Sequence, residues 1–248
     1  MSDSTAAQRA PQQEKAVGLS GSTLKLIAIV TMFIDHLGVV AFETQISNYM
    51  VPYYIMRLIG RLAFPIFCFL LVEGFFHTRD VKKYALRLLV FAFISEIPFD
   101  LAFNRQLFYW RHQNVFFTLF IGLLVIALLD HTKHAFHGFL QFVVEIIVLV
   151  AGILLGQFLY TDYGAVGVLA IVFLYMFRQY KSNALAMGIS VIWLSAMNII
   201  ESPALIDILL VKFYNGKRGL NLKYVFYAFY PAHLLLLYLF FHFILKTV

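Results

Sequence analysis

The sequence predicts an all-α protein, an integral membrane bundle whose helices cross the bilayer several times. Three observations favour this fold class: 62% of the 248 residues are hydrophobic, only 13% are charged, and the mean hydropathy is +0.83. A soluble domain carries about 45–50% apolar and about 25% charged residues. A chain of this length cannot remove so much apolar surface from water by folding on itself. We therefore expect the lipid bilayer to be its main partner.

The basic charge does not indicate a nucleic-acid partner. The net charge is +6, but most Lys and Arg residues lie in short segments between apolar runs, where the positive-inside rule places them. The sequence has no basic and aromatic module typical of nucleic-acid binding. Cys68 is the single cysteine, and His131, His134 and His137 lack a carboxylate cage, so we expect no metal site.

We interpret the chain as one domain of about 8–10 transmembrane helices behind a short tail. Residues 1–19 are polar and lack the features of a cleaved signal peptide, so we expect a disordered cytoplasmic tail, followed by a transmembrane domain over 20–248. Each crossing needs about 20 mostly apolar residues. The runs that fit are, in order, 24–42, 53–75, 84–103, 115–129, 139–159, 165–177, 184–200 and 224–245, with a shorter ninth run at 203–214.

The charges between the runs predict their orientation. If the N-terminal tail lies in the cytoplasm, the loops on that side carry nearly all the basic residues, as the positive-inside rule requires. This holds only if the run 203–214 crosses the membrane, so nine crossings are preferred, with the C-terminus outside. If that run does not cross, the C-terminus lies inside and the last basic loop is misplaced. The inner residues are Arg79, Lys82, Lys83, Lys133, Arg178, Lys181, Lys212, Lys217, Arg218 and Lys223, and the outer ones are Arg105 and Arg111.

Ionisable residues within the runs collect at one depth in the outer half of the membrane. A charged side chain in hydrocarbon costs at least about 2.5–3.5 kcal/mol, so such residues pair inside the bundle or line a polar cavity. Counting about 1.5 Å of rise per residue along each helix, we expect a shared cavity about half-way across that opens outward. Its predicted members are Asp35, His36, Arg57, Arg61, Glu96, Asp100, Tyr230 and His233, near Asn114, Thr118, Asp162 and Tyr163.

Structural explanations for these residues stay open. Arg57 and Arg61 lie one helical turn apart and could simply pair with Glu96 and Asp100 to hold helices together, since buried charges need partners. An intramembrane histidine is often a hydrogen-bonded packing residue. Two histidines, with a carboxylate next to His36, favour a functional role over packing alone.

A second polar group lies at the predicted inner face. Lys82 and Lys83 follow the second run, and the turn Asn215-Gly216-Lys217-Arg218-Gly219 precedes the last. Basic loops that contain glycine can bind phosphates through backbone N–H groups and positive charges. The positive-inside rule alone explains the lysines, but it explains the turn less well.

Short motifs recur in order through nearly the whole chain. The most specific are Gly60-Arg61-Leu62-Ala63-Phe64-Pro65 and Ser95-Glu96-Ile97-Pro98-Phe99-Asp100. The others lie at 24–28, 35–38, 57–67, 73–78, 114–118, 162–164, 215–216 and 229–234. With these motifs the chain resembles the TraX family of membrane proteins, which is named for the protein that acetylates the N-terminus of conjugative F-pilin.

The resemblance implies a polytopic acyltransferase of the bacterial cytoplasmic membrane, with its N-terminus inside. Such an enzyme takes acetyl groups from cytosolic acetyl-CoA and delivers them to an acceptor on the far side. The acceptor could be a pilin-like peptide amine, a glycan or another envelope component. Within this frame, Lys82, Lys83, Asn215, Lys217 and Arg218 are assigned to the CoA phosphates.

Roles in the predicted cavity follow from the chemistry of acyl transfer, which needs a general base and a stabilised oxyanion. We assign His36 as the base, with Glu96 or Asp100 to orient it, because the adjacent Asp35 points to another side of the helix. Arg57 or Arg61 would hold the oxyanion or the acceptor. The alternative base is His233, with Tyr230 as a hydroxyl donor.

Two other classes stay open. A proton-coupled transporter could use the same cluster as a proton relay, but the sequence shows no paired broken helices of the kind that common transporters carry. A non-catalytic membrane assembly protein would tolerate substitution of His36 and Arg61 as long as the helices still pair.

Overall fold

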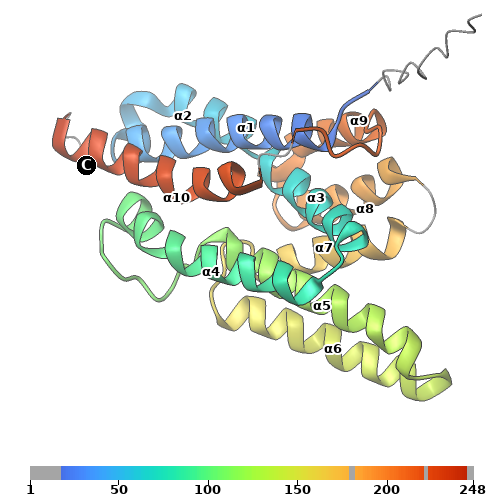
Figure 1. Cartoon of the computed structure of the whole chain (residues 1–248). Coiled ribbons are helices and arrows are strands. Elements are labelled where there is room, and N and C mark those ends of the chain that lie inside the picture. The colour runs from blue at the N-terminus through green and yellow to red at the C-terminus, as the bar shows by residue number, and fades with distance from the viewer. Residues whose placement is uncertain (1–17, 179–181, 221–222, 245–248) are drawn as a thin grey trace, which may run out of the picture.

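Helices form the regular structure of the described residues, which are 18–178, 182–220 and 223–244 of the computed structural model. The predicted all-α class is confirmed, and only residues 18 and 19 of the predicted tail lie within the described part. Figure 1 shows the arrangement. The elements are α1 (Gly21–Phe42), η1 (Glu43–Gln45), α2 (Ile46–Gly60), α3 (Ala63–His77), α4 (Val81–Phe99), η2 (Asp100–Asn104), α5 (Val115–Ala135), α6 (Gly138–Phe158), α7 (Gly164–Arg178), α8 (Asn183–Met197), η3 (Ile199–Ile206), α9 (Asp207–Lys212), α10 (Lys223–Leu239) and η4 (Phe240–Ile244).

Several of these helices have the length and composition of membrane spans. Four helical stretches in the described residues are long and apolar enough to cross a bilayer, namely Gly21–His77, Val115–Ala135, Gly138–Phe158 and Tyr224–Phe243. The first of them joins α1, α2 and α3. The helices α7 and α8 are apolar but shorter. The protein is therefore a multi-helix membrane protein, while nine crossings stay a prediction.

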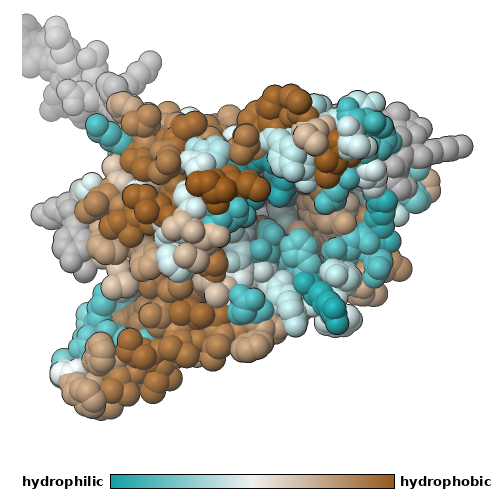
Figure 2. Space-filling view, turned by 180° about the vertical axis from the view of Figure 1, so that it is seen from behind, coloured by the Kyte–Doolittle hydropathy of each residue, from teal (hydrophilic) through white to brown (hydrophobic). Residues whose placement is uncertain are grey.

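The helix α6 has the exposed apolar surface that is typical of a membrane-spanning helix. It lies at the edge of the molecule against α5 and α7, and its buried residues are two glycines, Gly152 and Gly156. Large apolar side chains such as Phe142 and Ile147 are more than half exposed. Figure 2 shows apolar residues over much of one face of the molecule, with polar residues gathered toward one side around a hollow.

The predicted run 53–75 is not one straight helix. The helix α2 ends at Gly60, two tight turns follow at Arg61 and Leu62, and α3 leaves at an angle to α1 and α2 (Figure 1). Pro65, in the first turn of α3, has no N–H to donate to the carbonyl of Arg61, and its ring disfavours a straight continuation. The break frees the Arg61 side chain to reach two other elements.

The segment 203–214 returns along α8 as the short elements η3 and α9. The loop after α9 is hydrogen-bonded to the start of α1. The Leu19 N–H donates to the Phe213 carbonyl at 2.8 Å, and the Gly21 N–H donates to the Lys217 carbonyl at 2.8 Å. The last basic loop and the start of α1 therefore lie at the same end of the bundle.

A close approach of two helices requires the glycine at position 60. A Cβ atom placed on Gly60 would lie 2.2 Å from the Cβ atom of Asp35 on α1. Because the clash involves an atom next to the backbone, it cannot be relieved by rotating the end of a side chain. The absence of a side chain here lets α2 carry Arg57 against α1.

Replacing Gly60 with alanine is expected to destabilise the protein by about 1–3 kcal/mol, the usual cost of overpacking a tight contact. The check is thermal unfolding in detergent micelles. Gly188→Ala is the matched control, because the near neighbour that a Cβ there meets among the described residues is Ile208, at an ordinary contact distance of 3.7 Å. Equal melting temperatures for the two variants would contradict the expected clash.

Candidate functional site

A cavity of about 580 Å³ lies where α1, α2, α3, η2, η3 and α10 meet. Polar residues surround a hollow on the face that Figure 2 shows. Of the eight predicted catalytic residues, the structure brings five to its wall, namely Asp35, His36, Arg57, Arg61 and Tyr230. Glu96, Asp100 and His233 do not line it.

A chain of ion pairs crosses one wall of the cavity. Arg57 Nη1 lies 2.7 Å from Asp35 Oδ2, and Arg61 Nη2 lies 3.1 Å from Asp35 Oδ1. Arg61 Nη1 lies 2.8 Å from Glu201 Oε1 on η3. Two arginines thus balance two carboxylates, as buried charges require. Arg57 has 27% of its side chain exposed and Arg61 only 10%, so Arg57 is the cation that faces the open space.

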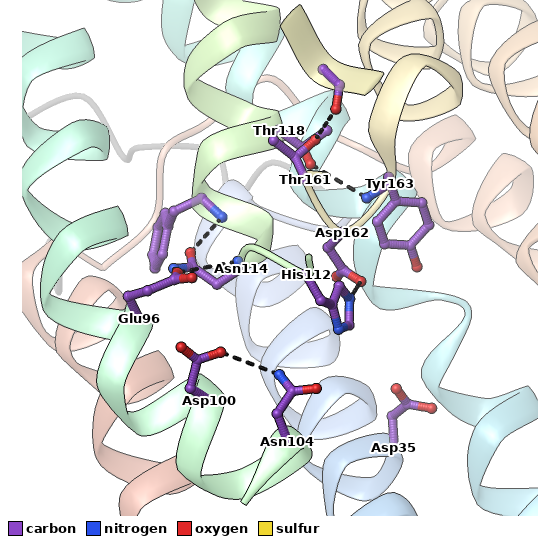
Figure 3. A network of polar contacts seen from close by, with 12 residues as sticks. Asp35, Glu96, Asp100, Asn104, His112, Asn114, Thr118, Thr161, Asp162 and Tyr163 are labelled. Carbon is purple, nitrogen blue, oxygen red and sulfur yellow. Dashed lines mark hydrogen bonds and ion pairs between the residues drawn. The ribbon is translucent and has the colours of Figure 1, made fainter. Parts of the chain in front are cut away.

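The alternative that was left open, pairing of these arginines with the carboxylates of α4 and η2, is not what the described residues show. Among the described residues, the Asn114 side chain donates to Glu96, and the Tyr109 N–H donates to Asp100 Oδ2 at 2.7 Å. Figure 3 shows Glu96 with Asn114 and Asp100 with Asn104. The prediction that Glu96 or Asp100 orients His36 was therefore wrong. Both carboxylates instead hold the segment before α5.

The histidine of α10 is the group that contacts His36. His36 Nδ1 and His233 Nε2 lie 2.7 Å apart, and His233 Nδ1 lies 2.8 Å from the carbonyl oxygen of Phe229. His233 is 3% exposed, so it is shielded from the cavity behind His36. Both predicted histidines belong to the site, but only one of them reaches its wall.

The sequence interpretation missed Glu201, Asn198 and His112 as cavity residues. Glu201 falls between the predicted runs 184–200 and 203–214, so it was not counted among the ionisable residues within the runs. The available signal was a carboxylate between two apolar segments, next to Ser202 and Pro203. His112 lies just before the predicted run 115–129, so it was not counted among the ionisable residues within the runs.

His112 and Asp162 form an ion pair between two loops at the cavity (Figure 3). His112 Nε2 lies 3.1 Å from Asp162 Oδ1. The hydrogen bond that His112 donates to the Asp162 carboxylate raises the pKa of His112, and partial burial opposes that effect. The folded state therefore holds this proton more tightly than the unfolded chain does.

Replacing Asp162 with asparagine is expected to lower the pKa of His112 toward its ordinary value. In the wild type, the His112–Asp162 pair makes its full contribution to the stability of the fold at pH values below the ordinary pKa of histidine, about 6.5. That contribution is lost as pH rises through the raised pKa. Melting temperatures across this range, with His112→Gln as a control that cannot titrate, measure the effect. An unchanged pH dependence in the Asp162→Asn variant would contradict the pairing.

The residues assigned to phosphate groups lie in two places, the first turn of α4 and the loop after α9. Lys82 and Lys83 are in the first turn of α4, where Lys83 Nζ lies 3.3 Å from Asp80 Oδ2. Lys217 and Arg218 are exposed in the loop that is bonded to the start of α1. The Asn215 side chain is engaged within this loop, because it donates to the Gly18 carbonyl and accepts from the Lys217 N–H. In the part of the chain that is described, no group of three His, Cys, Asp or Glu side chains gathers as a metal site.

The fold and the cavity define a polytopic helical membrane protein with a polar site buried between its helices. Residues 20–241 match the family model described as TraX protein, and the chain belongs to the TraX family.

Two relatives are informative. The chain is 32% identical over 245 residues to the "Probable fimbrial assembly protein FimC, serogroup H1" of Dichelobacter nodosus, covering 89% of this chain and 95% of the relative. It is 28% identical over 126 residues to the "Uncharacterized protein RP591" of Rickettsia prowazekii (strain Madrid E), covering 50% of this chain and 44% of the relative. No solved structure matches the chain.

Proposed function

We propose that the protein is a membrane-embedded acyltransferase that moves an acetyl group from cytosolic acetyl-CoA to an acceptor on the far side of a bacterial cytoplasmic membrane. The observation that carries the proposal is an imidazole and a partly exposed guanidinium on the wall of one intramembrane cavity, His36 beside Arg57. These are the two groups that acyl transfer needs, a base and an oxyanion donor.

The chemical step balances with these residues. His36 takes the proton from the attacking amine or hydroxyl as the acceptor atom bonds to the thioester carbonyl carbon. The carbonyl oxygen becomes an oxyanion beside Arg57. When the C–S bond breaks, the thiolate leaves and takes the proton back from His36. The products are the acetylated acceptor and free CoA.

The two arginines on the cavity wall, Arg57 and Arg61, have different roles in this proposal. Arg61 donates to Asp35 and Glu201 and also to the Arg57 carbonyl at 3.1 Å, so its donors are committed to the fold. Arg57 donates to Asp35 through Nη1 and keeps part of its side chain open to the cavity. We therefore assign the oxyanion to Arg57 and a supporting role to Arg61.

The two substrates reach the site from opposite sides in this proposal. The donor enters at the end where Lys217 and Arg218 lie beside the start of α1, which we place in the cytoplasm on the positive-inside rule. The acceptor enters past His112 and Asp162. The name of the Dichelobacter relative makes a fimbrial subunit a reasonable first acceptor to test, with glycans and other envelope components next.

The first experiment is acetyl-CoA binding to the purified protein by calorimetry. We expect saturable binding that is lost in the Lys217→Ala/Arg218→Ala variant and retained in Arg111→Ala, which removes a positive charge from the predicted outer side. Radiolabelled acetyl transfer to envelope fractions then tests the reaction. No binding to demonstrably folded protein would overturn the acyltransferase proposal.

A proton-coupled transporter is the second candidate. Glu201 Oε2 is buried and has no hydrogen-bond partner among the described residues, which suits a carboxyl group that gains and loses a proton. This candidate predicts proton flux in sealed vesicles without any release of CoA thiol.

A further inference from the structure

We propose that His36 and His233 form a two-imidazole relay, in which His36 Nε2 is the base and His233 fixes its tautomer and stores the proton during transfer. The inference rests on the proposed acyltransferase function for its catalytic part. Its structural part, the location of the protons on the two rings, can be tested without any reaction.

The two rings lie edge to edge in nearly one plane. The angle between the ring planes is 5° and the ring centres are 5.0 Å apart, while the nearest nitrogens are 2.7 Å apart. The distance between centres is close to the N···N distance plus the two ring radii, so the rings are not stacked face to face. The N–H of one ring therefore points along the lone pair of the other, which is the geometry of a strong hydrogen bond.

The backbone of α10 determines which nitrogen carries each proton. The Phe229 carbonyl can only accept, so His233 Nδ1, 2.8 Å away, must carry a proton. A neutral imidazole has one N–H, so His233 Nε2 is a bare acceptor. His36 Nδ1 must then be the donor across the 2.7 Å contact, and His36 Nε2 is left with its lone pair.

The free nitrogen of His36 faces the reaction space. His36 lines the cavity. Several buried side-chain atoms of the described residues lack a hydrogen-bond partner, and His36 Nε2 is not among them. The ring is held edge-on against Phe103 and Tyr230, with centroid distances of 5.1 and 5.9 Å. The tautomer and the ring orientation thus present a basic nitrogen to a bound acceptor.

The relay ends inside the protein rather than at water. His233 is 3% exposed, and the Phe229 carbonyl that it contacts has no proton to exchange. The charged groups that face the pair are Arg57 and Arg61, and their charges are balanced by the carboxylates of Asp35 and Glu201. A proton that enters at His36 Nε2 can be shared with His233 but cannot escape past it.

Proton movement along this line balances. The acceptor gives its proton to His36 Nε2, and the His36 Nδ1 proton moves to His233 Nε2. His233 is then a cation with both N–H groups donating, one of them to the Phe229 carbonyl. When the thiolate leaves, both protons move back and the thiolate becomes a thiol. A fixed orienting group behind a histidine base is the arrangement that makes serine hydrolase triads effective.

The decisive measurement is ¹⁵N NMR of histidine-labelled protein in detergent micelles. The chain has 8 histidines, and single substitutions identify the two signals. We expect both rings to be neutral and protonated on Nδ1 at neutral pH, and we expect His233→Ala to release His36 into a mixture of tautomers. A proton on His36 Nε2 in the wild type would overturn the relay, whatever the activity results are.

Measurements of kcat distinguish a His233 that stores the proton from one that only packs against its neighbours. Gln at position 233 can still accept from His36 Nδ1 but cannot take up its proton. We expect His233→Ala to lower kcat about 100-fold with KM unchanged, at the lower end of the range that general-base catalysis supplies, and His233→Gln, which keeps the acceptor, to lower it about 10-fold. Full activity of His233→Gln would leave His233 a packing residue and overturn its storage role. His242→Gln, farther along the same helical stretch, is the matched control and should retain activity.

The two levels of the inference can fail separately. If the wild type shows the expected tautomers but transfers no acetyl group to any acceptor, the proposed function fails and the proton positions stand. If transfer occurs but the tautomers differ, the function stands and the relay is wrong.

Discussion

Replacing His36 with alanine is expected to lower kcat for acetyl transfer about 10²–10⁴-fold, the contribution typical of a positioned general base. The variant should still insert and fold, because the ion pairs of Asp35, Arg57 and Arg61 do not include His36. The measurement is transfer of radiolabelled acetyl from acetyl-CoA under saturating donor.

His131→Ala is the control for this experiment, since it removes the same side chain from an exposed position at the end of α5. Donor binding should be nearly unchanged in His36→Ala, because the proposed base acts on the acceptor. A variant with wild-type kcat would remove His36 from the role of base and leave the cavity without an assigned one.

Replacing Arg61 with methionine is expected to destabilise the fold by about 3–5 kcal/mol, the cost of leaving a buried charge without its partner. Asp35 keeps its ion pair with Arg57, but Glu201 loses its ion pair with Arg61. Thermal unfolding in micelles, followed by intrinsic fluorescence or by thiol labelling of the buried Cys68, measures the loss.

The double variant Arg61→Met/Glu201→Gln tests the reason for that loss. Removing both charges leaves no unpaired ion at position 201, so we expect much of the stability to return. Arg111→Met, on an exposed loop residue, should leave the melting temperature unchanged. A double variant no more stable than Arg61→Met would show that the ion pair is not what Arg61 contributes.

The fold class follows from composition because apolar content reports directly on the solvent that surrounds a chain. The break between α2 and α3 does not follow from hydropathy, which is continuous across it. Gly60 and Pro65 mark it, but both residues also occur within intact membrane helices. The number of crossings is equally hard to derive, because η3 and α9 are too short to satisfy a span criterion alone.

The candidate site could be predicted in part. Depth along each helix places His36, Arg57 and Arg61 at one level, because rise per residue is regular. The sequence does not give the rotation of each helix about its own axis, so it could not show which side chains face each other. The orienting partner of His36 was therefore assigned wrongly. Arg61 pairs with Glu201, 140 residues away, and that contact depends on how η3 folds back, which no local pattern encodes.

The ion pairs between α1 and α2 have a consequence for how the chain enters the bilayer during synthesis. Asp35 pairs with Arg57 and Arg61, only 22 and 26 residues later, so the first two helices can neutralise their charges against each other while the ribosome is still translating the rest. When opposite charges on two helices of a hairpin pair with each other, the free-energy cost of inserting them into the bilayer is lower than for the same charges unpaired. Glu201 is synthesised 140 residues after Arg61, so we expect it to enter a bundle in which Arg61 is already paired. We therefore expect the polar site to form from the first hairpin outward.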